Sequence, residues 1–252
     1  MLLAIDIGNT NISLGVFKGR GLLRRVDLPT QEYGFSRLKR LIKKEKVKDA
    51  IICSVVPRVT RLLKGYLKKT LPGKSYCLGA NIQAPVENLY RNPKQVGQDR
   101  LANAYAGIIL YGVPIIIVDF GTAVTFDVIS RNKKYLGGMI LPGLDISLEA
   151  LIERAALLPK IRLRKPREFI GRNTQESMLS GIVYGFSALT DDLTKRIKGE
   201  IGRDAKIIVT GGKGCLVAQY CRQIDRIDQD LTLKGLNLIY RDIVLNSMSK
   251  PR

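Results

Sequence analysis

Apolar runs alternate with amphipathic helical patterns along most of the 252-residue chain. In the first half, the apolar runs predict strands near residues 2–6, 12–17, 22–28, 50–54 and 75–78, and the helical spacing predicts helices at about 33–46, 57–69 and 98–111. The second half begins again with a hairpin from residue 115 to 129, followed by strands at 135–141 and 206–210 and helices at about 147–156, 174–198, 214–220 and 236–247. This interleaving predicts an α/β protein with two similar domains, at 1–112 and 113–252.

One polar interruption of the apolar pattern occurs twice. Ala4-Ile5-Asp6-Ile7-Gly8-Asn9-Thr10-Asn11 recurs in altered form as Ile117-Val118-Asp119-Phe120-Gly121-Thr122-Ala123-Val124. In each copy an apolar run leads to an aspartate, a turn of small residues and a second apolar run. The aspartates are 113 positions apart, so the repeat indicates duplication of a whole domain rather than a solenoid.

The chemistry of this repeat favours a phosphate ligand. A carboxylate at a strand end can hold a hydrated cation, and the N–H and hydroxyl groups of a glycine turn can bind phosphate. The first turn offers Gly8, Asn9, Thr10, Asn11 and Ser13. A single copy is equally typical of an ordinary polar hairpin, but the second copy favours a nucleotide cleft between two facing hairpins.

Three further motifs carry candidate chemistry. Gly211-Gly212 ends a predicted strand, where a flat ring or a phosphate can approach the backbone, although a tight turn explains the pair as well. Asp99 and Arg100 fall in the first turn of a predicted helix, whose positive end stabilises the carboxylate. Asp99 could accept a proton from an attacking hydroxyl and Arg100 could bind an anion, or the two could form only a helix cap with a salt bridge. Thr174 precedes a long helix and could be part of its cap.

Composition narrows these options. The chain has no His, and its four Cys residues show no CxxC spacing, which argues against a zinc site and excludes His-dependent nucleophiles. We expect a cytoplasmic protein, because no basic segment precedes the first strand and the apolar run 108–118 is too short to cross a membrane. In that compartment we expect the thiols to be reduced and partly buried.

The formal net charge is +20, with many Lys and Arg residues in the helical patterns 37–48 and 58–69. Solvated amphipathic helices are the simpler interpretation, and a nucleic-acid surface is the alternative.

Together these motifs resemble the type III pantothenate kinase family, within the superfamily of acetate and sugar kinases, Hsp70 and actin. The resemblance extends over essentially the whole chain. It rests on the segments 6–11, 54–57, 92–93, 96–100, 119–127, 137–143, 171–174 and 210–212. It implies two ribonuclease H-like (actin-like ATPase) domains with a nucleotide cleft between them. It also implies ATP-dependent phosphorylation of pantothenate, the first committed step towards coenzyme A.

The resemblance also implies roles for individual residues. The first phosphate site would be lined by Asp6, Ile7, Gly8, Asn9, Thr10, Asn11, Ile12 and Ser13. Asp6 would lie near Mg²⁺, Thr122 would contact an ATP phosphate, and Asp119 would ligate a monovalent cation, K⁺ or NH₄⁺. Gly211 and Gly212 would lie near the adenosine. The pantothenate pocket would comprise Tyr90, Gly97, Gln98, Asp99, Arg100 and, from the partner in a homodimer, Thr174. Asp99 would be the general base.

The chain departs from the family pattern at two places. Gln98 stands where the family usually has Ala, and Ala155-Ala156-Leu157-Leu158-Pro159 replaces Thr-Ala-x-Leu-Pro. ATP and pantothenate are the expected partners, and the charge of +20 is high for a small-molecule kinase of this size, which leaves nucleic acid open as a further partner. The alternatives are a non-catalytic regulator that binds nucleic acid through the basic helices, or a kinase of the same superfamily that acts on another small alcohol.

Overall fold

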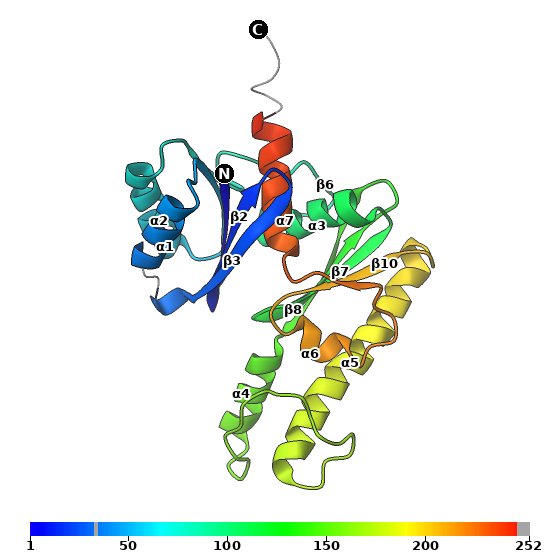
Figure 1. Ribbon diagram of the computed structural model, residues 1–252. Helices are drawn as coiled ribbons and strands as arrows, with labels where there is room; N and C mark the ends of the chain where they lie inside the picture. The colour runs from blue at the N-terminus through cyan, green and yellow to red at the C-terminus, as the bar shows by residue number, and fades with distance from the viewer. Residues whose placement is uncertain (33–34, 246–252) are drawn as a thin grey trace. The chain divides into compact units, whose positions relative to one another are not determined.

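The computed structural model describes residues 1–32 and 35–245, which form two compact units. The first comprises Met1–Leu110 together with the segment that starts at Leu231, and the second comprises Tyr111–Asp230. Each unit contains a sheet with helices packed on it, as Figure 1 shows. Within the described residues, no helix is long and apolar enough to cross a bilayer.

The first unit contains a sheet with strand order β3-β2-β1-β4-β5. Its strands are β1 (Leu2–Ile7), β2 (Asn11–Lys18), β3 (Gly21–Pro29), β4 (Asp49–Ser54) and β5 (Ser75–Cys77). β1 pairs antiparallel with β2 and parallel with β4. The helical segments of this unit are η1 (Thr30–Glu32), α1 (Phe35–Lys44), α2 (Pro57–Thr70), η2 (Pro93–Gln95), α3 (Gln98–Tyr111), α7 (Leu231–Ile239) and the π-helical η3 (Tyr240–Leu245). A short strand, β6 (Glu87–Asn88), lies between β5 and η2 in the sequence.

The strands of the second unit repeat this topology, in the order β11-β10-β7-β8-β9. They are β7 (Ile115–Phe120), β8 (Ala123–Ile129), β9 (Lys134–Pro142), β10 (Lys206–Thr210) and β11 (Arg226–Ile227). The helices are α4 (Leu144–Arg154), α5 (Thr174–Ile201) and α6 (Gly214–Ala218). An antiparallel meander followed by two parallel strands thus occurs twice, and this confirms the predicted α/β class with two similar sheets.

Alternating burial explains the two-sided core of the first unit. Leu3 and Ile5 point to the face covered by α1 and α2, whereas Leu2 and Ala4 point to the face covered by α3 and α7. Both faces of β1 are therefore apolar and buried, as expected for the central strand of such a sheet. Figure 1 shows α1 and α2 beside each other on their face of the sheet.

The last helix corrects one expectation. The sequence predicted a helix from about residue 236 in the second domain, but α7 begins at Leu231 and packs on the first sheet. Leu233, Leu236 and Ile239 are buried there with residues of β1 and β2, and Gly235 crosses α3 so closely that a Cβ would lie 2.2 Å from the carbonyl oxygen of Ala102. The predicted helix start at 33 and the predicted end at 246–247 fall outside the described residues.

Three buried or partly buried tyrosines donate hydrogen bonds to carboxylates within single units. Tyr240 donates to Asp49 Oδ2 (2.9 Å), Tyr105 to Asp242 Oδ2 (2.6 Å), and Tyr111 to Asp228 Oδ2 (2.6 Å). Burial raises the pKa of each phenol, and the neighbouring carboxylate raises it further.

We expect Tyr240→Phe to lower the free energy of unfolding by about 1 kcal/mol, because Asp49 loses one hydrogen bond but keeps the bond from the Lys74 N–H (2.7 Å). The folded protein holds the Tyr240 proton more tightly than the unfolded chain does. Its contribution is therefore complete below the unfolded pKa of about 10 and declines as the pH rises further. Thermal denaturation between about pH 8 and 11 should show a shallower alkaline decline in the variant. Equal slopes would contradict this account of Tyr240.

Candidate active site

Asp6 and Asp119 occupy equivalent positions in the two sheets. Asp6 lies opposite Ser13 in the β1–β2 ladder, and Asp119 lies opposite Thr125 in the β7–β8 ladder. Each aspartate stands one residue before the last pair of its ladder, on a strand that also pairs with a parallel neighbour. The sequence repeat is therefore a structural repeat, with a half-buried carboxylate and an opposing hydroxyl residue in each copy.

The first turn has a shape fixed by its neighbours. The Gly8 N–H donates to the Asn11 carbonyl (2.9 Å) and closes the loop. The buried Thr30 braces it, because its hydroxyl donates to the Gly8 carbonyl (2.7 Å) and its N–H to the Thr10 carbonyl (2.9 Å). Asn9, Thr10 and Asn11 are exposed. Sequence reasoning missed Thr30, since it lies about 20 residues from the turn and no local pattern marks it.

The second turn is one residue shorter. Three residues separate the Phe120–Val124 pair, whereas four separate the corresponding pair in the first hairpin. The Gly143 N–H donates to the Thr122 carbonyl (3.1 Å), and a Cβ at Gly143 would lie 2.1 Å from that oxygen. Gly143 thus holds the backbone of Thr122, while Thr122 itself is exposed to solvent.

Gly211 packs directly on the Asp119 strand. It has φ +87°, and a Cβ there would lie 2.4 Å from Asp119 Oδ1 and 2.6 Å from the Phe120 backbone. The Lys213 N–H donates to the Phe120 carbonyl (3.1 Å), which fixes the loop after β10 against β7. Gly212 is exposed, and a Cβ at this position would meet no other atom within 4 Å. The second unit therefore brings Gly211 against Asp119, with the exposed Gly212 next in the chain.

Asp99 is held at the start of α3 by its own neighbours. The Arg100 N–H donates to Asp99 Oδ1 (2.9 Å), and Arg100 is buried. A Cβ at Gly97 would lie 2.3 Å from the same oxygen, so any side chain at that position would displace the carboxylate. The predicted helix from Gln98 to Tyr111 is confirmed, with Asp99 in its first turn.

One buried thiol connects Asp99 with Asp6. Cys53 pairs with Asp6 in the β1–β4 ladder and is fully buried. Burial raises the pKa of the Cys53 thiol well above its usual value, and the carboxylates of Asp6 and Asp99 raise it further. Because the thiol stays neutral, it adds no negative charge beside them.

The other residues predicted for the pantothenate pocket, Tyr90, Gln98 and Thr174, each make contacts within their own stretch of the structure. Tyr90 is half-buried in the loop before η2, and its N–H donates to Asn88 Oδ1 (3.0 Å). Gln98 packs its side chain on Gly79 (φ +82°), and among the described residues its buried Oε1 has no hydrogen-bond partner. Thr174 is exposed at the first turn of α5, which Asn173 caps by accepting a hydrogen bond from the Glu176 N–H (3.0 Å).

The donor set fits a cation that is held largely by its substrate. No group of three or more Cys, Asp or Glu side chains that could hold a metal occurs in residues 1–32 and 35–245. Mg²⁺ in kinases is usually bound through one or two carboxylates plus substrate phosphates, rather than by a cage made only of protein. The single half-buried carboxylate beside each exposed turn is compatible with that mode.

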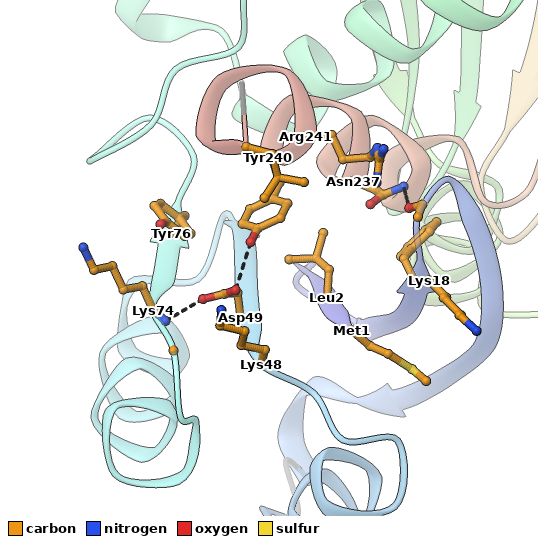
Figure 2. Close-up of a pocket in the computed structure, with 14 residues that line it drawn as sticks. Met1, Leu2, Lys18, Lys48, Asp49, Lys74, Tyr76, Asn237, Tyr240 and Arg241 are labelled. Atoms are coloured by element: carbon orange, nitrogen blue, oxygen red, sulfur yellow. Dashed lines mark hydrogen bonds between the residues drawn. The ribbon is translucent and has the colours of Figure 1, made fainter. Parts of the chain in front are cut away.

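A separate cavity of about 570 Å³ lies at the other end of the first sheet, and Figure 2 shows its lining. Its walls come from the first residues of β1, the end of β2, the starts of β4 and β5, and the α7–η3 segment. Asp49 accepts hydrogen bonds there from Tyr240 and the Lys74 N–H (Figure 2). None of the predicted site residues lines this cavity, so it does not belong to the candidate active site.

Comparison with known proteins settles the family. The family model described as type III pantothenate kinase matches residues 2–196. The chain belongs to the type III pantothenate kinase family. A Geotalea daltonii type III pantothenate kinase is 42% identical, with 96% of this chain and 98% of that protein covered. An Agathobacter rectalis type III pantothenate kinase is 40% identical, with 96% and 97% covered.

Solved structures with low identity share the fold of this pantothenate kinase family member. A Campylobacter jejuni protein described as a Baf family transcriptional activator has a TM-score of 0.62 at 22% identity, over 95% of this chain and 98% of that one. MreB5 of Spiroplasma citri, bound to ADP, has a TM-score of 0.54 at 14% identity, and the match covers 99% of this chain and 98% of that one. The predicted actin-like ATPase fold is thereby confirmed.

We expect Gly211→Ala to destabilise the second unit, because the added methyl would meet Asp119 and Phe120 at a residue with positive φ. Overpacking of this kind typically lowers the free energy of unfolding by about 1–3 kcal/mol. This loss corresponds to a melting temperature roughly 2–10 °C lower. Gly212→Ala is the matched control, since it has open space and should melt close to the wild-type temperature. Calorimetry compares the two variants, and equal melting temperatures would refute the close packing at Gly211.

Proposed function

We propose that the chain transfers the γ-phosphoryl group of ATP to the primary hydroxyl of pantothenate and gives 4′-phosphopantothenate, the first step of coenzyme A biosynthesis, in the cytoplasm. Membership of the type III pantothenate kinase family supports this activity. The observation that carries it is the structural repeat: Asp6 and Asp119 stand at equivalent ladder positions, each half-buried beside an exposed turn. This repeat supports two phosphate-type turns, one in each unit.

Asp99 is the general base in this proposal. Its carboxylate accepts the Arg100 N–H and is fixed in direction by Gly97 and by the helix start. A carboxylate held in this way can accept the proton of the pantothenate hydroxyl as that oxygen attacks phosphorus. Such a reaction needs positioning and charge neutralisation more than covalent chemistry. The absence of His from the sequence does not hinder it.

The two exposed turns are the proposed contacts for ATP. In the first unit, the turn braced by Thr30 presents the exposed Asn9, Thr10 and Asn11 to the phosphates, beside Asp6, Gly8 and Ser13. The side chains of Ile7 and Ile12 are buried in the core, so these two residues would contribute through their backbone. In the second unit, Thr122 contacts a phosphate, and the adenosine lies near Gly211 and Gly212, where the open space around Gly212 lets it approach the backbone. Backbone N–H groups in such turns form concave sites for anions.

Asp6 and Asp119 are the proposed protein ligands of the cations. Asp6 would hold Mg²⁺ together with the phosphates, and Asp119 would hold the monovalent cation, K⁺ or NH₄⁺. The cations would supply neutralisation of the phosphate charge. The chain contributes one half-buried carboxylate to each, beside an exposed turn.

The proposed pantothenate pocket is formed by Tyr90 and the segment Gly97, Gln98, Asp99 and Arg100, and it is completed by Thr174 from a second copy in a homodimer. Arg100 would bind the pantothenate carboxylate, a geometry that suits a guanidinium group. Gln98 packs on Gly79, so the glutamine that replaces the usual alanine finds room against the backbone of a neighbouring loop. This packing supports a pocket that tolerates Gln98.

Asp99→Asn should lower turnover by roughly 10²- to 10⁴-fold, because the amide keeps an acceptor for the Arg100 N–H but cannot take up the proton. The dissociation constant for ATP should change by less than about twofold, since the phosphate turns are intact. Coupled-enzyme kinetics measure turnover, and calorimetric titration measures ATP binding. Asp192→Asn, at an exposed position on α5, is the control. Near wild-type turnover in Asp99→Asn would remove Asp99 from the base role.

The activity and its cation requirement are tested in one assay. ADP release is measured with ATP, Mg²⁺ and pantothenate, in K⁺, NH₄⁺ or Na⁺ salts of equal ionic strength. We expect release that depends on pantothenate and is stimulated by K⁺ or NH₄⁺, and we expect Asp119→Asn to lose most of that stimulation because one ligand of the cation is neutral. No release that depends on pantothenate in any salt would reject the proposed reaction. Equal stimulation of Asp119→Asn would reject only the cation role of Asp119.

A further inference from the structure

Two helices of the first unit concentrate the positive charge of the molecule. α1 and α2 contain 10 and 14 residues, with five basic side chains each and no acidic one. The whole chain has 42 basic and 22 acidic residues, and its formal net charge is +20. Half of the net charge therefore lies in less than a tenth of the chain. A generally basic composition would spread the surplus along the sequence, so it does not explain this concentration.

All ten cations point away from the protein core. Most described apolar side chains of both helices are buried against one face of the first sheet, namely Leu38, Leu41, Ile42, Val59, Leu63 and Leu67, whereas Leu62 is exposed. The basic side chains are all exposed, and the two helices lie beside each other on their face of the sheet in Figure 1. We call this surface the basic face; it comprises Arg37, Lys39, Arg40, Lys43, Lys44, Arg58, Arg61, Lys64, Lys68 and Lys69.

The basic face continues into a groove beside α1. A hollow of about 510 Å³ is lined by α1 and by β2 and β3, with Arg24, Arg37, Arg40 and Lys44 among its walls. Arg24 forms an ion pair with Glu45 (3.3 Å) at the edge of this region. Arginine guanidinium groups bind phosphate oxygens in a bidentate manner, so a groove with three of them suits a phosphate backbone.

We propose that the basic face binds duplex nucleic acid through its phosphates, without reading the base sequence. A duplex carries one negative charge per about 1.7 Å, so the length of α2, about 21 Å, corresponds to about 12 phosphates. Roughly half of them face a protein on one side, which gives about six contacts for the ten cations. The number of charges on the two surfaces is therefore comparable.

Two other anionic partners fit the face less well. Proteins that bind single strands stack bases on exposed aromatic rings, whereas Tyr66, the aromatic ring among the described side chains of α1 and α2, packs on the core. A helix that binds a membrane surface inserts its apolar stripe into the lipid, but the stripes of α1 and α2 are buried against the sheet apart from Leu62, which is 44% exposed. Base stacking and insertion into lipid therefore contribute little at this face. Binding through charge is left, and a duplex, which presents its phosphates on the outside, is the partner that suits it.

The test compares two variants with the same net charge. The face variant carries Lys39→Glu, Lys43→Glu, Lys64→Glu and Lys68→Glu. The control variant carries Lys133→Glu, Lys160→Glu, Lys165→Glu and Lys195→Glu, all at exposed positions of the second unit. Fluorescence anisotropy measures binding of a labelled DNA duplex of about 20 base pairs and arbitrary sequence, between about 50 and 200 mM salt.

We expect the wild type to show a slope of log K against log salt of about −5, which is the value for about six phosphate contacts. The face variant should lose more than about tenfold in affinity and about 3 in slope, whereas the control should stay within about threefold of the wild type. Kinase activity, measured in parallel, should be unchanged in both variants, because none of these lysines belongs to the proposed site. If the face variant fails to fold by circular dichroism, Gln at the same four positions replaces Glu.

Several results would overturn the proposal. A wild type without salt-dependent binding, or equal losses in the face and control variants, would show that the basic face is not a binding surface. Tighter binding of single strands than of duplex would reject the duplex as ligand. Binding to vesicles that contain phosphatidylserine, without binding to DNA, would assign the face to anionic lipid. Each of these results is independent of whether the chain phosphorylates pantothenate.

Discussion

The candidate site depends on a carboxylate at the end of a buried apolar strand. The strand β1 is covered on both faces by helices, and its only charged residue, Asp6, stands where the strand meets a solvent-exposed turn. The same arrangement recurs at Asp119 in β7. An ionised carboxylate cannot move deeper without a large desolvation cost, so a register shift that drew β1 further into the core would also bury the Asp6 carboxylate. The position of each carboxylate is therefore set by the core.

Close backbone contacts make these positions more specific. Gly97 fixes the direction of the Asp99 carboxylate, Gly143 holds Thr122, and Gly211 packs on Asp119. In each case a methyl group would collide with a backbone atom or a carboxylate oxygen. The glycines therefore act through the space they leave open, and the side chains of the site need few direct bonds to one another.

The sequence predicted most of this arrangement because its signals are local. The hairpin turns, the start of α3 and the strand before Gly211 each combine a periodic apolar pattern with a residue that ends it. Thr30 was not predictable, because its bonds to the first turn depend on the pairing of β3 with β2. The position of α7 was not predictable for a similar reason: its apolar stripe could cover either sheet, and only tertiary packing decides between them.

The return of α7 to the first sheet has a consequence for folding during synthesis. Residues 111–230 form a complete unit and can close as soon as they leave the ribosome. The first sheet emerges earlier, but one of its faces stays without α7 until Leu231–Ile239 have been translated, after the whole of the second unit. The order of completion is thus the reverse of the order of synthesis, so the N-terminal half is the part that most needs protection by chaperones in the nascent chain.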